Sequence, residues 1–226
     1  MMQRSYYVSD LKRTVIVFDL DDTLYFEADY QFSGYKAIQK KIKDLYGIEI
    51  PLMLRESSED NDILSYICKE LSLPETVKES LLWFYRLHLP DIKLDEKVKL
   101  LLEQLDKSAM AVAILTDGRS VTQRLKLKAL GLQHYEVFIS EEWQESKPGL
   151  KRFNAIAEKY SGASRFLYIG DNVKKDFIAP NALNWLTVGI RDQGRNIHPQ
   201  NVKLEPPTSL PKVWINNLSE LNQILC

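Results

Sequence analysis

Residues 14–24 read Thr-Val-Ile-Val-Phe-Asp-Leu-Asp-Asp-Thr-Leu, so that an apolar, mostly β-branched run ends in a cluster of carboxylates and a hydroxyl. Unbroken apolarity is typical of a parallel strand that is covered on both faces of its sheet. Four similar runs follow, at residues 110–115, 136–139, 166–169 and 185–188. Because helical patterns separate most of these runs, the sequence predicts a doubly wound α/β domain.

The segments between the predicted strands divide the chain further. After the second run, one apolar helical stripe is formed by Val121, Leu125, Ala129 and Leu132. Such a stripe predicts that the helix packs this face on the sheet. The interval between the first two strands is far longer than a crossover helix needs, and its periodicity is helical throughout. We therefore expect an inserted all-helical cap at residues 25–91, with residues 1–24 and 92–226 forming the α/β core domain.

Composition and charge exclude several classes of protein. Hydrophobic residues make up 45% and charged residues 27% of the 226, as in globular proteins rather than disordered ones. Lys and Arg number 30 against 31 Asp and Glu, so no overall positive field attracts nucleic acid or anionic lipid. Cys68 and Cys226 show no metal or disulfide spacing, which favours a reducing, cytoplasmic setting. With no apolar run near the roughly 20 residues of a membrane span, we expect no nucleic-acid, membrane or obligatory protein partner.

Polar residues follow the first four predicted strands. In open α/β sheets the carboxyl ends of the strands line one crevice, so these residues are expected to converge. In chain order they are Asp19, Asp21, Asp22, Thr23, Thr116, Asp117, Gly118, Ser140, Lys147, Asp171, Asn172 and Asp176. Crowded carboxylates raise one another's pKa and favour a bound cation. With Asp19 and Asp171 as oxygen ligands and neither His nor Cys nearby, Mg²⁺ is favoured over zinc.

The other groups of this set suit a phosphoryl ligand. Donors and positive charge come from Thr116, Lys147 and the backbone N–H groups of Asp117 and Gly118. Such groups stabilise phosphoryl oxygens. In Asp19-x-Asp21, an extended chain would point both side chains the same way, whereas a turn after Asp19 could aim both at a substrate. One carboxylate can then attack phosphorus while the other passes a proton to the leaving oxygen.

The order of these motifs resembles that of the haloacid dehalogenase-like superfamily of Mg²⁺-dependent phosphohydrolases. The matching segments are Phe-Asp19-Leu-Asp21-Asp-Thr-Leu, Leu-Thr116-Asp-Gly, Lys147-Pro and Gly-Asp171-Asn-x-x-x-Asp176. The resemblance covers almost the whole chain and implies a Rossmann-like core with a helical C1-type cap, because the insert follows the first motif. The chain departs from the family near Asn184, where a glycine is usual before the next strand.

The resemblance implies a two-step reaction. Asp19 would attack the phosphate and form an aspartyl-phosphate, while Asp21 would protonate the leaving group and then activate water. Thr116 and Lys147 would neutralise the phosphoryl oxygens. The dehalogenases of this family lack the second aspartate, because a departing halide needs no proton, so Asp21 argues against dehalogenation.

The resemblance also implies a metal site. Mg²⁺ would lie between the side chain of Asp19, the backbone carbonyl of Asp21 and the side chain of Asp171. Asp176 would stand behind these ligands and orient Lys147 or a metal-bound water. Asp176 could instead be an ordinary residue in the first turn of a helix, where the helix dipole favours a carboxylate.

We expect a phosphoric monoester hydrolase that acts on a small phosphorylated metabolite, a sugar phosphate or a nucleotide-like monoester, because a cap excludes bulky partners. Two alternatives remain at this point. A phosphomutase or phosphotransferase would pass the same phosphoryl group to a second hydroxyl, and a regulatory or scaffold protein would keep the fold without catalysis. Six cap residues could face the site: Tyr25, Phe26, Glu27, Tyr30, Arg86 and His88. His134 and His198 are expected at the surface or partly buried.

Overall fold

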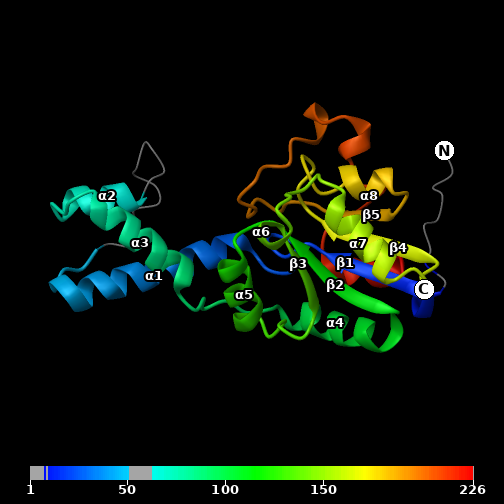
Figure 1. Cartoon of the computed structure of the whole chain (residues 1–226), viewed down its shortest axis with the longest axis horizontal. Coiled ribbons are helices and arrows are strands. Elements are labelled where there is room, and N and C mark those ends of the chain that lie inside the picture. The colour runs from blue at the N-terminus through cyan, green and yellow to red at the C-terminus, as the bar shows by residue number, and fades with distance from the viewer. Residues whose placement is uncertain (1–7, 9, 51–62, 226) are drawn as a thin grey trace.

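The computed structural model describes residues 8, 10–50 and 63–225. Its centre is a six-stranded parallel sheet with the order β3-β2-β1-β4-β5-β6 (Figure 1). The strands are β1 (Thr14–Phe18), β2 (Ala111–Thr116), β3 (Glu136–Ile139), β4 (Arg165–Gly170), β5 (Leu186–Ile190) and β6 (Val213–Ile215). The first five agree with the predicted runs to within two residues at each end. The acidic segment after β1 therefore leaves the middle of the sheet.

Helices cover both faces of this sheet, as the doubly wound prediction required. The α-helices of the described residues are α1 (Glu27–Tyr46), α2 (Ile63–Glu70), α3 (Thr76–Leu87), α4 (Glu96–Ser108), α5 (Ser120–Ala129), α6 (Ser140–Trp143), α7 (Lys151–Lys159) and α8 (Ile178–Ala182). Those that pack on the two faces of the sheet are α4, α5, α7 and α8. A 3₁₀ helix at Leu218–Gln223 follows β6. Within the described ranges, no helix combines the length and apolarity that crossing a membrane requires.

The side chains of β1 show how the two faces are filled. Ile16 and Phe18 belong to the apolar cluster shared with α4, α5 and the C-terminal 3₁₀ helix. Val15 and Val17 belong to the opposite cluster, shared with α7 and α8. All four are fully buried, and each contributes on the order of 1.5–3 kcal/mol of transfer free energy. Strand alternation thus fixes the register of β1, and with it the direction in which Asp19 leaves the sheet.

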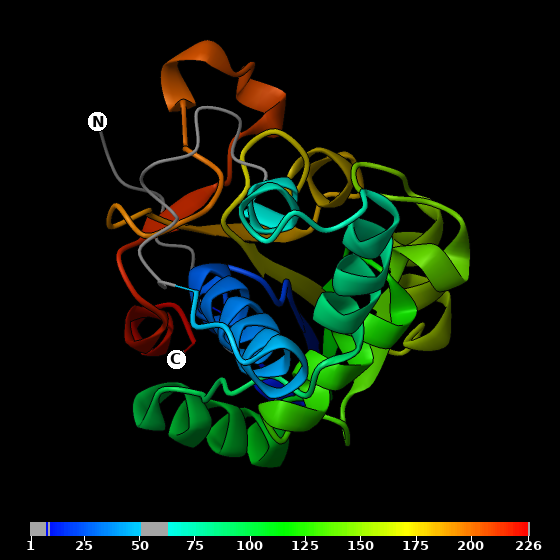
Figure 2. The same cartoon turned by 90° about the vertical axis from the view of Figure 1, so that its left-hand side faces the viewer.

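Helices α1, α2 and α3 stand apart from the sheet and have a core of their own (Figure 1). Ile38 and Ile42 of α1 pack there against Ile67 of α2 and Leu81 of α3. Viewed from the end of the molecule that carries these helices, α1 and α3 lie in front of the sheet (Figure 2). Helix α3 also contacts α5. We call α1, α2 and α3 the cap helices. The division of the chain at residues 25 and 91 stays a prediction.

The predicted orientation of α5 is wrong in part. Val121 was expected to pack on the sheet but is 37% exposed, whereas Gln123 and Lys126 are 1% and 3% exposed. The apolar contacts come from Leu127 and Leu130, and from Ala129 and Leu132 as predicted. The physical reason is that α5 begins at the carboxyl edge of the sheet, so one polar stripe of the helix is buried against the acidic residues there.

Asn184 explains the departure from the family pattern before β5. Its φ is 58°, in the left-handed region that L residues adopt rarely and glycine readily. Asparagine is among the side chains that tolerate this conformation best. The turn after α8 is therefore kept without glycine, and the change does not reach the acidic residues at the strand ends.

Candidate active site

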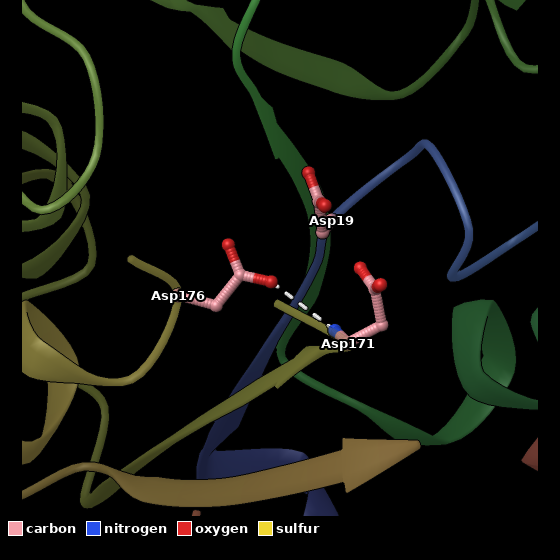
Figure 3. A group of neighbouring side chains, drawn as sticks. All are labelled: Asp19, Asp171 and Asp176. Carbon is pink, nitrogen blue, oxygen red and sulfur yellow. Dashed lines mark hydrogen bonds between the residues drawn. The ribbon is translucent and has the colours of Figure 1, made fainter. Parts of the chain in front are cut away.

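Three aspartates meet at the carboxyl ends of β1 and β4. Asp19 directly follows β1, Asp171 directly follows β4, and Asp176 comes from the loop before α8 (Figure 3). One carboxylate oxygen of each lies within 4.8 Å of the others, and all three residues are buried. The expected convergence of Asp19 and Asp171 is therefore present, and Asp176 lies beside them.

Lys147 is buried among these carboxylates. Its Nζ lies 2.8 Å from Oδ1 of Asp19 and 2.7 Å from Oδ1 of Asp176, and it donates to the hydroxyl of Tyr168 at 3.2 Å. Burial opposes its charge, but the two carboxylates outweigh burial and raise the pKa of Lys147 well above its usual value. Lys147 therefore stays cationic and holds Asp19 in place.

The neighbouring basic residues lie elsewhere. The Lys151 ammonium donates to the carbonyl of Trp143 at 3.0 Å. Arg152 is fully buried, donates to the carbonyl of Thr116 at 2.9 Å and pairs with Asp117 at 2.6 Å. Of these three cations only Lys147 contacts Asp19, whereas Arg152 supports the loop after β2.

Asp176 organises the start of the loop after β4. Its Oδ2 accepts hydrogen bonds from the backbone N–H groups of Asp171 at 3.1 Å and Asn172 at 2.9 Å, while Oδ1 contacts Lys147. A Cβ at Gly170 would come within 2.5 Å of Oδ2, so glycine is needed there for this close approach. Because both of its oxygens are engaged, Asp176 positions Lys147 and the backbone of Asp171.

The negative charge of Asp19 and Asp171 is not fully balanced by the basic residues nearby, which favours a bound cation between them. Burial is the main cause that raises the pKa of Asp19 to about 7, against the opposing charge of Lys147. Burial, followed by the charges of Asp176 and Asp19, raises the pKa of Asp171 to about 9. Asn196 donates to Oδ2 of Asp171 at 2.8 Å, and no described cation forms an ion pair with it. Two buried carboxylates with too little positive charge and only oxygen ligands fit a hard divalent ion such as Mg²⁺.

A turn directly after Asp19 brings Asp21 to the same cavity. Asp22 makes this turn with φ of 53°, and its carboxylate accepts the N–H groups of Glu27 at 2.8 Å and Ile197 at 2.9 Å. Of the two geometries left open by the sequence, the structure has the turn. Asp19 and Asp21 consequently line one cavity of about 170 Å³.

Asp21 is held by three donors. Its Oδ1 accepts from Lys126 at 2.7 Å and from the Tyr25 hydroxyl at 2.5 Å, and Gln123 donates to Oδ2 at 2.8 Å. Burial alone would raise the pKa of Asp21, but the charge and hydrogen bond of Lys126 outweigh it and lower the pKa. Asp21 is thus ionised and fixed in orientation.

The end of β2 and the loop after it supply the remaining predicted residues. Thr116 is fully buried, and its Oγ1 accepts from Gln123 at 2.7 Å. Asp117 lines the cavity, with its carboxylate paired to Arg152 as described. Gly118 differs from expectation, because its N–H donates to Oγ of Ser140 at 2.9 Å and is engaged within the protein.

Several residues of the site were not predicted. The cavity is lined by Asp19, Asp21, Asp22, Glu27, Thr116, Asp117, Asp171, Asn172, Lys175 and His198. His198 was expected to be an ordinary surface residue; it is exposed, yet it lies at the cavity. Gln123 and Lys126 are spaced three apart on α5, which places them on one face, and this spacing was the available signal.

Replacing Lys126 with Met should shift the pH dependence of turnover to higher pH. Loss of the ammonium leaves Asp21 buried without its main counter-charge, so its pKa rises, by about 1–3 units on the scale of paired carboxylates. The measurement is the pH profile of kcat/KM. Lys128→Met changes an exposed lysine of the same helix and is the control. A Lys126→Met profile that coincides with wild type, or moves to lower pH, would contradict the role given to Lys126.

Comparison with known families finds a match over most of the chain. The family model described as haloacid dehalogenase-like hydrolase matches residues 16–190. The pyrimidine 5'-nucleotidase YjjG of Escherichia coli (strain K12) is 31% identical over 120 residues, which cover 51% of this chain. The same alignment spans 49% of the nucleotidase, about half its length. The glyceraldehyde 3-phosphate phosphatase of Methanopyrus kandleri is 27% identical over 216 residues, covering 82% of this chain and 88% of that protein.

Solved structures share the fold. The HAD-hydrolase YfnB from Bacillus subtilis, bound to magnesium, superposes with a TM-score of 0.66 at 20% identity, over 94% of this chain and 98% of that one. A HAD family hydrolase from Deinococcus radiodurans R1, with bound phosphate and sodium, superposes with a TM-score of 0.62 at 16% identity, over 94% of each chain. At these identities the likeness shows the architecture of sheet and helices.

Proposed function

Since the chain belongs to the haloacid dehalogenase-like hydrolase family and is an enzyme of its phosphatase type, we propose that it hydrolyses small phosphate monoesters with Mg²⁺ through an aspartyl-phosphate. The observation that carries this proposal is the placement of Asp19 and Asp21 on one cavity, each held by its own lysine. A nucleophile and a proton donor are both needed to expel an alcohol from phosphorus.

Asp19 and Asp21 have different roles in the formation and the hydrolysis of the aspartyl-phosphate. Asp21 first takes up a proton from solvent, against the charge of Lys126 that favours its ionised form. A carboxylate oxygen of Asp19 then attacks phosphorus, the bond from phosphorus to the leaving oxygen breaks, and protonated Asp21 gives that oxygen its proton. In the second step Asp21 takes a proton from water, whose oxygen attacks phosphorus and releases Asp19 and phosphate. Asp21 ends the cycle protonated, as it was when Asp19 attacked. Thr116 and Lys147 lie beside this path and stabilise the phosphoryl oxygens.

Mg²⁺ would be held by the carboxylates of Asp19 and Asp171 and by the backbone carbonyl of Asp21. When bound, it supplies positive charge that offsets the negative charge of the phosphate and the aspartates. Asp176 keeps Lys147 and the backbone of Asp171 in position. Asn196 orients the carboxylate of Asp171 from the loop that follows β5.

The proposed substrates are sugar phosphates or nucleotide-like monoesters. Support comes from the small cavity, about 170 Å³, and from the cap helices beside it. Among the relatives, one is a glyceraldehyde 3-phosphate phosphatase and another a pyrimidine 5'-nucleotidase, and these names point to small monoesters. A cap of this kind limits the size of what can reach Asp19.

The test is release of inorganic phosphate from a panel of sugar phosphates, nucleotides and short phosphorylated metabolites, with Mg²⁺ or with chelator. We expect turnover of a few members that chelator abolishes and added Mg²⁺ restores. An isomeric phosphate ester without free phosphate would instead identify a mutase. Preference for a phosphopeptide over every metabolite, or undiminished activity in chelator, would contradict the proposal.

Mg²⁺ should raise the melting temperature more at pH 9 than at pH 6. Without a cation, folded Asp171 keeps a proton up to about pH 9, whereas in the unfolded chain its pKa is near the ordinary 3.8. Between about pH 3.8 and pH 9 the folded state therefore binds more protons than the unfolded state. The free energy of unfolding falls as the pH rises through this range. Mg²⁺ must displace that proton from nearly every molecule at pH 6 but from only about half of them at pH 9, where the pH equals the pKa of Asp171. The stabilisation by Mg²⁺ therefore grows with pH.

The measurement is thermal unfolding with chelator or with Mg²⁺ at several pH values. Asp171→Asn is the matched variant, because it keeps the shape of the side chain and removes the charge. We expect this variant to lose most of the Mg²⁺-dependent shift. An equal or larger shift at pH 6 in the wild type would contradict the assignment of Asp171 as a ligand.

A further inference from the structure

A second cavity adjoins the first on the side of the cap helices. It has a volume of about 280 Å³ and lies between the end of α3 and the start of α5. Its lining includes Asp21, Tyr30, Tyr85, Arg86, Arg119 and Lys126. Because Asp21 borders both cavities, a leaving group that receives its proton there would extend into this second space.

The acidic groups of this second cavity are already compensated. Asp21 is paired with Lys126 at 2.7 Å, and Asp117 with Arg152 at 2.6 Å. Burial, followed by the charge of Asp21, raises the pKa of Glu27 to about 7, so Glu27 carries only part of a charge near neutral pH. The negative charge lining the cavity is thereby largely cancelled.

Two guanidinium groups remain without such compensation. Throughout the part of the chain that the structure describes, neither Arg86 nor Arg119 has a carboxylate within the 4 Å of an ion pair. Arg86 lies near the end of α3 with its guanidinium 5.3 Å from the ring centre of Trp83, and Arg119 immediately precedes α5 and is exposed. Both line the cavity, Arg86 from the cap helix α3 and Arg119 from the residue before α5 in the core.

We propose that this cavity is an anion subsite, in which Arg86 and Arg119 bind a carboxylate or a second phosphate on the leaving group of the substrate. The inference rests on the proposed function and narrows its substrate class to monoesters whose alcohol part carries a further negative group. Guanidinium groups bind such anions through two parallel hydrogen bonds. A volume of about 280 Å³ suits a sugar acid or sugar phosphate.

The subsite also gives the cap helices a role in selection. Arg86 belongs to α3, and the hydroxyl of Thr122 on α5 donates to the carbonyl of Arg86 at 3.5 Å, a long hydrogen bond. An anion bridging Arg86 and Arg119 would add a second link between α3 and the core. Tyr30 and Tyr85 line the same cavity and offer flat walls to a sugar ring.

The test compares kcat/KM for matched pairs of substrates. Sorbitol 6-phosphate and 6-phosphogluconate are both open chains and differ by a carboxylate, and fructose 6-phosphate and fructose 1,6-bisphosphate differ by a second phosphate. We expect wild type to favour the anionic member of at least one pair by about tenfold or more, and the favoured pair identifies the anion. Arg86→Gln and Arg119→Gln should each lower that preference about tenfold, the effect of losing one charge-assisted contact.

Arg124→Gln is the control, because Arg124 lies on α5 but pairs with Glu142 at 2.7 Å outside the cavity. Equal rates within both pairs, or a preference that survives both Arg86→Gln and Arg119→Gln, would overturn the subsite. If no phosphate is released from any compound, the proposed function fails instead. In that case the subsite is tested separately by calorimetry, as binding of 6-phosphogluconate and sorbitol 6-phosphate to Asp19→Asn. Equal Kd values for the two compounds would overturn the subsite.

Discussion

Asp19→Asn should lower kcat by at least about 10⁴-fold, because it removes the attacking oxygen and keeps the size and shape of the side chain. Lys147 retains its contact with Asp176 in this variant, and one buried carboxylate is lost from a crowded acidic cluster. The variant should therefore fold and melt no lower than wild type in the absence of Mg²⁺. Phosphate release and thermal unfolding are the two measurements.

Asp44→Asn makes the same chemical change at an exposed position of α1 and should retain wild-type rates. Substantial residual turnover by Asp19→Asn would show that another group attacks phosphorus. The variant also offers a direct probe of the intermediate. Wild-type protein quenched during turnover should carry a phosphoryl group on Asp19, detectable by mass spectrometry, and the variant should carry none.

Lys147→Met should lose both activity and stability. The substitution leaves Asp19 and Asp176 buried without the ammonium that contacts each within 2.8 Å. Breaking a buried ion pair by removing one partner costs about 3–5 kcal/mol. For a chain of this length that lowers Tm by roughly 6–20 °C. Urea unfolding measures the stability, and kcat should fall by about 10³-fold or more with the loss of transition-state charge stabilisation.

Adding Asp176→Asn to Lys147→Met separates the two effects. Asparagine keeps an oxygen that accepts the N–H groups of Asp171 and Asn172 but no longer leaves an unpaired charge. Part of the lost stability should return in the double variant, while activity stays low. Lys151→Met, at an exposed lysine at the start of α7, should change neither. If Lys147→Met were as stable as wild type, the stabilising role given to the contacts of Lys147 with Asp19 and Asp176 would be contradicted.

The parallel sheet could be predicted because its strands carry a local signal. Residues 15–18 and 137–139 are unbroken apolar runs, and the structure has strands at Thr14–Phe18 and Glu136–Ile139. The convergence of Asp19 and Asp171 followed from topology, since parallel strands bring their carboxyl ends to one edge. Strand β6 was harder, because Val213–Ile215 is too short to be distinguished from an apolar loop segment.

The supporting groups of the site could not be predicted in the same way. Lys126 and Arg152 are charged residues on helices, and the usual expectation for such residues is exposure to solvent. Both are buried because a carboxylate from a distant segment pairs with them, Asp21 in one case and Asp117 in the other. That pairing depends on the packing of α5 and α7 on the sheet. Asn196 and His198 likewise reach the site only through the course of the loop after β5.

The central position of β1 has a consequence for how the protein forms in the cell. Val15 pairs with Ala111 on one side and with Phe166 on the other, so the first strand to leave the ribosome has no partner at that time. At about 5–20 residues per second, its neighbours follow roughly 5–20 s and 8–30 s later. During that interval β1 is an apolar segment with two open edges, the kind of nascent chain that a ribosome-associated chaperone shields.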